Sequence, residues 1–258
     1  MRRQWLLGVA VLAAVAGGTA TVYSHFQVLV PSRDNVAGAD RDVALEVLFT
    51  HPMRGGPVME MSRPRRFGVL VRGRRTDLLA TLRERKVGGK TAFGASYKIR
   101  QPGDHVFHLE PAAYWEPAER KMIVHYTKVV VNGFDSGEGW DALVGLPVEI
   151  EPLVRPYGLW TGNCFRGIVR KGGKPVPFAE IEVEYYNRTG RAVAPCEAFV
   201  TQVIKADASG TFCYVMPKAG WWAFAALIDG DEKMAAPDGK KVDVELGAVM
   251  WVRAVDMD

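Results

Sequence analysis

The sequence has 258 residues, of which 48% are hydrophobic and 24% are charged, a composition typical of a globular protein rather than a disordered chain. Lys and Arg number 33 and Asp and Glu number 29, so the formal net charge is only +4. So small a charge gives no electrostatic case for nucleic acid as a partner. The length suits one large domain or two ordinary ones.

The first 24 residues have the three parts of a secretory signal peptide: a basic start, an apolar stretch and a small-residue cleavage region. Cleavage after Ala20 or after Ser24 satisfies the small-residue rule. An uncleaved anchor helix is the alternative, because an apolar run of about 19 residues just spans a bilayer. We expect cleavage of residues 1–24 and a periplasmic mature protein, whose net charge falls to +2 because two arginines and no acids are removed.

Short candidate strands separated by Gly and Pro turns follow in the first half of the mature chain. They cover residues 25–30, 42–50, 66–72, 91–99, 104–110 and 121–131. Residues 76–86 suit a short helix or a pair of strands. Residues 151–158 contain two prolines and no periodic pattern, which predicts a domain boundary.

The second half predicts six more strands, at residues 164–170, 178–186, 197–205, 210–216, 220–229 and 246–255. Between residues 179 and 186 small or apolar residues alternate with polar ones, mostly glutamate, as in a strand with one buried and one solvated face. Two blocks of short strands predict an all-β fold of two tandem antiparallel β-sandwiches, the first immunoglobulin-like. We expect the sandwiches to cover residues 25–152 and 153–258.

Familiar catalytic motifs are absent from the sequence, which has no Gly-rich phosphate loop, no nucleophile elbow and no His-Glu-x-x-His motif. We therefore expect no enzymatic activity. The three cysteines, Cys164, Cys196 and Cys213, lack the C-x-x-C spacing of a zinc site. Export would allow one disulfide among them, and the sequence does not select the pair.

All five histidines lie in the first half of the chain, and histidine is the commonest protein metal ligand. His51 follows a predicted strand at the start of a loop, a position from which ligands are often presented. His125 lies within a predicted strand, where core packing is the simpler interpretation. His105 and His108 are an odd number of positions apart, so on a strand they face opposite ways and cannot share a site. We expect surface roles for these two.

The chemistry of His25 depends on which bond the signal peptidase cuts. Cleavage after Ser24 frees its α-amine, with a pKa of about 7.7–8.0, and the amine and the imidazole Nδ1 then chelate one ion together. With His51 and His125 this gives an all-nitrogen site suited to nickel, cobalt, copper or zinc. Cleavage after Ala20 leaves His25 an ordinary strand residue.

Several long motifs resemble those of one family of exported bacterial proteins. They are HFQVLVPS, FTHPMRGGPVMEM, FGVLV, GASYKIRQPGDHVFHLEPAAYWEPAE, HYTKVVVN and RPYGLWTGN, and they cover nearly all of the mature chain. The family is a domain of unknown function whose members are described as periplasmic accessory components of nickel or cobalt uptake. The resemblance implies a protein that binds Ni²⁺ or Co²⁺, with Cu²⁺ or Zn²⁺ as alternatives, and a membrane permease as partner.

The recurring positions of that family correspond to His25, His51, Glu110, Glu116 and His125 in this sequence. The resemblance implies the three histidines as metal ligands. It implies the two glutamates as an oxygen ligand or as acceptors that fix an imidazole tautomer. The segments GIVRKGGKPVPFAEIEVEYYN and KADASGTFCYVMPKAGWWAFAAL resemble a transthyretin-like or carboxypeptidase-regulatory β-sandwich.

Two other functions are compatible with the same sequence. An exported adhesion or scaffold module that binds no metal would present the aromatic residues Tyr114, Trp115 and Trp160 to a partner. A copper-dependent oxidative enzyme would share the N-terminal histidine and a second histidine with this chain, which is a narrow similarity.

Overall fold

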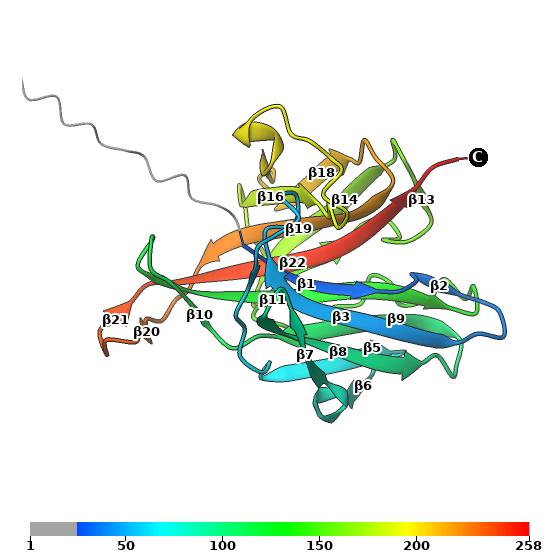
Figure 1. Cartoon of the computed structure of the whole chain (residues 1–258). Coiled ribbons are helices and arrows are strands. Elements are labelled where there is room, and N and C mark those ends of the chain that lie inside the picture. The colour runs from blue at the N-terminus through cyan, green and yellow to red at the C-terminus, as the bar shows by residue number, and fades with distance from the viewer. Residues whose placement is uncertain (1–24, 258) are drawn as a thin grey trace, which may run out of the picture.

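The computed structural model describes residues 25–257, and their fold is nearly all β-structure (Figure 1). The predicted all-β fold class is confirmed. Within these residues the helical elements are two short 3-10 turns, η1 (Leu79–Thr81) and η2 (Glu197–Phe199). No helix in this part of the chain has the length and apolar character needed to cross a bilayer. The predicted signal peptide, residues 1–24, lies outside the described residues.

The strands form two outer sheets and one large central sheet. The first outer sheet contains β1 (Phe26–Pro31), β3 (Asp42–Thr50), β4 (Val58–Met59), β7 (Arg83–Val87) and β8 (Lys90–Lys98). The second contains β12 (Val148–Pro152), β14 (Cys164–Lys171), β15 (Lys174–Pro175) and β18 (Thr211–Val215). A separate hairpin is formed by β20 (Met234–Ala235) and β21 (Lys241–Val242).

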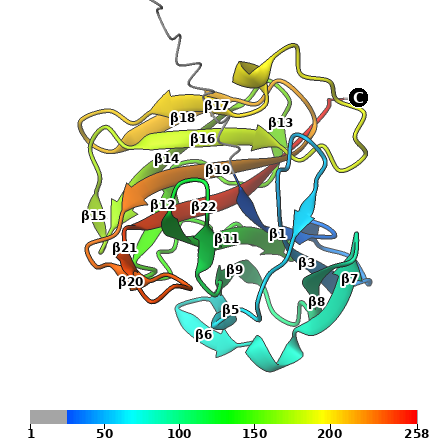
Figure 2. The same cartoon turned by 60° about the vertical axis from the view of Figure 1, so that its left-hand side comes forward.

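The central sheet has 11 strands and runs through the whole molecule. Its main path is β17 (Gln202–Lys205), β16 (Glu180–Tyr185), β19 (Gly220–Asp229), β22 (Val244–Val255), β11 (Lys121–Gly133), β9 (Gly103–Glu110), β5 (Arg66–Val71) and β6 (Arg74–Asp77). The short strands β2 (Asn35–Val36), β10 (Tyr114–Glu116) and β13 (Leu159–Trp160) pair at its sides. Figure 2 shows this path from β17 at the top to β6 at the bottom.

The two halves of the chain meet where β11 pairs with β22. This pairing is parallel and extends from Met122 opposite Val244 to Val129 opposite Trp251. Parallel neighbours need a long connection, and here the whole second half of the chain provides it. The two sandwiches therefore share one continuous sheet, and the predicted boundary at residue 152 falls at the end of β12, which pairs with β14.

A hydrophobic core lies on each face of the central sheet. One core fills the space against the second outer sheet and includes the aromatic rings of Phe165, Phe212 and Phe224. The other fills the space against the first outer sheet. Trp251 from β22 is fully buried there, and its indole N–H donates to the Gln27 carbonyl at 2.9 Å. Each core thus takes residues from both halves of the chain.

Residues 76–86 form neither the helix nor the strand pair that the sequence allows. They hold the end of β6, the turn η1 and most of β7, and these two strands pair with different neighbours, β5 and β8. The connection therefore crosses from the central sheet to the first outer sheet.

Candidate metal centre

Three of the predicted residues meet because three separate strands end or pass at one place. The antiparallel register of β1 and β3 places Phe26 opposite Thr50, so His25 and His51 follow side by side just beyond the ladder. Their ring centroids lie 4.3 Å apart and the rings are tilted by 38°. The Phe49 ring connects them to β11, since its centroid lies 5.6 Å from that of His25 and 6.0 Å from that of His125.

His125 lies deep in the central sheet with 3% of its surface exposed. Its Nδ1 and Nε2 are both buried and neither makes a hydrogen bond. Buried polar atoms without a partner are rare and call for an explanation. Gly247 lies opposite on β22, where an added Cβ would be 2.3 Å from Cδ2 of His125. The backbone therefore makes a space for the imidazole that any larger residue would fill.

The His25 imidazole is kept neutral by its surroundings. Burial, and then the neighbouring His51 and His125 rings, lower the pKa of His25 to about 4. A proton on His25 would place a positive charge in a partly apolar site against two further imidazoles. Near neutral pH the His25 imidazole therefore keeps one ring nitrogen with a lone pair that can bind a metal ion.

Two carboxylates flank the histidines. The Glu116 carboxylate, from the end of β10, lies 3.5 Å from Nδ1 of His25, and Glu116 is only 7% exposed. The Glu245 carboxylate lies 3.8 Å from Nε2 of His125 and also pairs with Lys121. Burial opposes ionisation of Glu245, but His125 and Lys121 lower its pKa to about 2. Both flanks of the cluster thus carry an acidic side chain.

The fifth predicted residue, Glu110, lies elsewhere. Its carboxylate is 3.6 Å from Nε of Arg66. Burial, and then the Glu110 carboxylate, raise the pKa of Tyr126. Tyr126 and His125 are consecutive in β11 and so point to opposite faces of the sheet. The structure brings His25, His51, Glu116 and His125 together and leaves Glu110 on the other side.

Glu245 and Gly247 are site residues that the sequence analysis missed. They reach His125 through a parallel pairing between segments about 120 residues apart, and no local pattern marks such a pairing. One signal was present, because a glutamate within the otherwise apolar strand 244–252 is unusual for a buried strand.

The expected surface role of His105 is wrong. His105 is fully buried, its Nδ1 lies 2.9 Å from the Gly103 carbonyl, and its ring packs edge-on against Tyr97. His108 is partly exposed as a residue, but both of its ring nitrogens are buried without a hydrogen bond. Residues of their strand, β9, belong to both hydrophobic cores, Val106 to one and Phe107 and Leu109 to the other, so both faces of the strand are covered.

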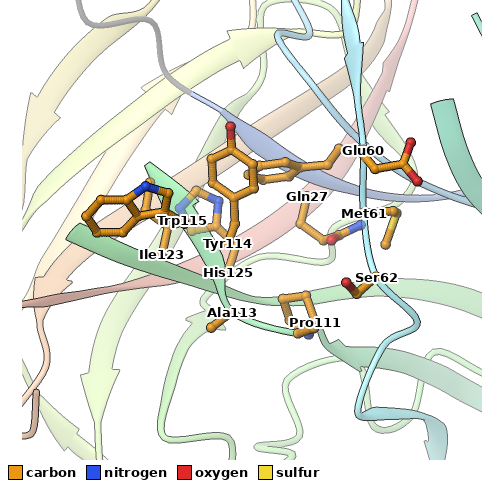
Figure 3. Close-up of a pocket in the computed structure, with 12 residues that line it drawn as sticks. Gln27, Glu60, Met61, Ser62, Pro111, Ala113, Tyr114, Trp115, Ile123 and His125 are labelled. Atoms are coloured by element: carbon orange, nitrogen blue, oxygen red, sulfur yellow. The ribbon is translucent and has the colours of Figure 1, made fainter. Parts of the chain in front are cut away.

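A cavity of about 240 Å³ adjoins the histidine cluster (Figure 3). His125 belongs to its wall, together with the aromatic rings of Phe49, Tyr114 and Trp115. Figure 3 shows Tyr114, Trp115 and His125 grouped on one side, with Glu60 and the sulfur of Met61 on the other. The cavity is therefore an aromatic-walled space with polar groups at its edge, next to the buried ring nitrogens of His125, which make no hydrogen bond.

The side chains alone do not form a complete metal-coordination site. Among residues 25–257, no set of three or more His, Cys, Asp or Glu side chains is arranged to hold an ion as it stands. The His25 and His51 rings pack against each other, so a ring rotation or a main-chain ligand is needed to complete a coordination sphere.

Comparisons with known proteins identify a family and a few distant folds. A family described as "Domain of unknown function (DUF4198)" matches residues 22–230. No curated protein matches the chain. The structure of the D0-D1 domain of intimin is similar at 11% identity and a TM-score of 0.25, over 88% of this chain and 99% of that one.

Two further structures have comparable scores. Trypsin-activated alpha-2-macroglobulin from Escherichia coli has 9% identity and a TM-score of 0.24, over 89% of this chain and 16% of that one. Titin domains A168-A170 have 8% identity and a TM-score of 0.22, over 89% of this chain and 68% of that one. Similarities this weak say nothing about function.

Proposed function

This chain belongs to the DUF4198 family, and we propose that it is a periplasmic protein that binds a transition-metal ion, Ni²⁺ or Co²⁺, and assists its uptake without catalysing a reaction. The observation that carries the proposal is the meeting of His25, His51 and His125 from three strands. The buried ring nitrogens of His125, which make no hydrogen bond, fit a group that binds between these rings.

The ligand atoms available at the site indicate which kind of metal ion it would bind. Imidazole and amine nitrogens suit nickel, cobalt, copper and zinc, whereas calcium and magnesium prefer oxygen. Cleavage after Ser24 would add the α-amine of His25 as a ligand that needs no further side chain. Glu116, near Nδ1 of His25, is the candidate oxygen ligand. Together with Glu245 it would offset the charge of a partly buried cation.

The cavity beside His125 supports a role in transfer rather than permanent storage. Its volume of about 240 Å³ gives a bound ion room for water or for an exchanging ligand. A membrane permease is the partner that we propose for such an exchange. Glu110 is left out of the proposed ligand set, because its neighbours are Arg66 and Tyr126.

The test combines the mature N-terminus with metal titrations. Intact mass of the exported protein should give a chain that begins at His25. Calorimetry with Ni²⁺, Co²⁺, Cu²⁺ and Zn²⁺ should then show tight binding. His25→Ala, His51→Ala and His125→Ala should each weaken it by about 100-fold or more, since even outer partners of metal ligands change affinity 10–100-fold. His108→Gln, outside the cluster, is the matched control and should leave affinity unchanged.

Three results would contradict the proposal. A mature chain beginning at Thr21, with affinity unchanged by His25→Ala, would remove the N-terminal chelate. Failure of the mature protein to bind any of the four ions at micromolar concentration would remove the metal function and favour the scaffold alternative. Copper-dependent oxidation of a substrate would show that the protein is an enzyme.

A further inference from the structure

Two of the three cysteines lie on neighbouring strands of the second outer sheet. In the antiparallel register of β14 and β18, Cys164 is opposite Val215 and Cys213 is opposite Arg166. Residues two apart on a strand share a face, so Cys164 and Cys213 are diagonal neighbours on one face. That face points outward, since Cys213 and Arg166 are exposed and Val215 is 53% exposed.

Both cysteines are free thiols, and the Cys213 side chain is close enough to Cys164 to raise the pKa of its thiol. Cys164 is half-buried and its thiol also donates to the Phe165 carbonyl at 3.5 Å. The third cysteine, Cys196, is exposed just before η2 and belongs to neither strand.

We propose that Cys164 and Cys213 close a cross-strand disulfide and that Cys196 remains a thiol. A disulfide oxidant such as oxidised glutathione supplies the chemistry. The exposed Cys213 sulfur attacks the oxidant, forms a mixed disulfide and releases one glutathione thiol. Cys164 then attacks that mixed disulfide at the Cys213 sulfur and releases the second. The protein loses two electrons and two protons, and the oxidant becomes two thiols.

Cys164 suits the second step better than the first. Burial, and then the neighbouring Cys213 side chain, raise the pKa of the Cys164 thiol. Because the thiolate is the nucleophile, the half-buried Cys164 thiol is the weaker first attacker, and it reacts once the Cys213 sulfur carries the mixed disulfide.

The bond would enclose a segment that supports the histidine cluster. Glu184 and Asn187 lie between the two cysteines in the sequence. The Met53 amide donates to Glu184 Oε2 at 2.9 Å, and the Asn187 side-chain amide donates to the Met53 carbonyl at the same distance. These contacts hold the loop that begins at His51. Closing residues 164–213 into a covalent loop restricts the unfolded chain and so stabilises this support.

The experiment titrates the full mature protein with mixtures of reduced and oxidised glutathione. Intact mass, maleimide labelling after unfolding and peptide mapping should show loss of two hydrogens, one remaining thiol and a link between Cys164 and Cys213. Cys196→Ser should keep the bond and leave no thiol, and its urea midpoint should rise on oxidation. Cys213→Ser should leave two thiols and no internal bond.

Three thiols that persist in excess oxidised glutathione would overturn the proposal. A link that involves Cys196 would also overturn it. An unchanged urea midpoint on closure in Cys196→Ser would overturn the stabilising role of the bond. None of these readouts uses a metal ion, so failure here is distinct from failure of the proposed metal function.

Discussion

The imidazole of His125 occupies a space that exists only because residue 247 is glycine. An added Cβ at Gly247 would lie 2.3 Å from Cδ2 of His125, closer than any real contact. Gly247→Ala should therefore displace the ring or separate β11 from β22 and lower the free energy of unfolding by about 1–3 kcal/mol. Urea denaturation measures this. Gly38→Ala is the control, because nothing lies within 4 Å of its Cβ position. Equal midpoints for the two variants would contradict the prediction.

A second residue-scale prediction concerns the buried ion pair of Lys128 and Glu149. They are 1% and 3% exposed, Lys128 Nζ lies 3.0 Å from Glu149 Oε2, and burial lowers the pKa of Lys128. Lys128→Met leaves a buried carboxylate without its cation, which should cost about 3–5 kcal/mol of unfolding free energy.

The matched control is Lys205→Met. The Lys205 pair with Glu180, at 3.3 Å, is 67% and 56% exposed, so its loss should cost about 0–1 kcal/mol. Chemical denaturation of both variants makes the comparison. A similar loss in both would mean that burial does not set the strength of the Lys128 pair.

At the scale of elements, hydrogen bonds to Glu184, near the end of β16, hold the loop that follows β3 in place. Glu184 is 1% exposed and accepts hydrogen bonds from the Met53 amide and, at 2.5 Å, from the Thr201 hydroxyl. Burial raises the pKa of Glu184 to about 7. Between its ordinary pKa, about 4.3, and 7, the folded state holds a proton that the unfolded state releases. Stability should therefore fall as pH rises through this window.

Glu184→Gln should remove that part of the pH dependence. The variant should have a flatter stability profile from pH 5 to 7 than the natural chain and should exceed its stability at pH 8, by on the order of 1–3 kcal/mol. Denaturation at a series of pH values measures both profiles. Glu180→Gln, which changes an exposed glutamate, should follow the natural profile. If the stability of Glu184→Gln changed with pH in parallel with that of the natural chain, Glu184 would not be the group responsible for this pH dependence.

Local patterns predict individual strands well and pairings poorly. The predicted strands at residues 42–50, 91–99 and 121–131 agree closely with β3, β8 and β11, because alternation and turn residues are local signals. The predicted strand at 197–205 begins with the turn η2, and only its last four residues form a strand, β17. His105 shows a further limit, because a sequence does not reveal that a second sheet covers the other face of its strand.

The candidate site likewise contains some residues that the sequence predicts and others that it does not. His25 begins one predicted strand and His51 follows the end of the next, so an antiparallel pairing of these two strands places them side by side. Glu245 and Gly247 could not be foreseen, because they reach His125 only through the parallel pairing of β11 with β22. Such a pairing depends on the path of the whole second half of the chain, which no local pattern contains.

At the scale of the whole molecule, the shared sheet predicts one cooperative unit. Trp251, from the end of the chain, is fully buried in the core against the first outer sheet and donates to the Gln27 carbonyl at 2.9 Å. Ala223, Ala225 and Val249 join it there. A fragment of residues 25–152 would lose these side chains together with the partner strand of β11, so we expect it not to fold alone.

The full mature chain should then unfold in a single transition, with tryptophan fluorescence and far-ultraviolet circular dichroism coinciding. Trp251→Ala should lower that transition by about 3–5 kcal/mol, because it removes a large buried side chain and leaves a cavity. If the two halves were independent, the same variant would destabilise one transition and leave a second unchanged. Two separate transitions, or a dispersed amide spectrum from fragment 25–152, would contradict the prediction. A single transition shifted as a whole would tie the histidine cluster to the integrity of both halves, since β22 supplies Glu245 and Gly247 to it.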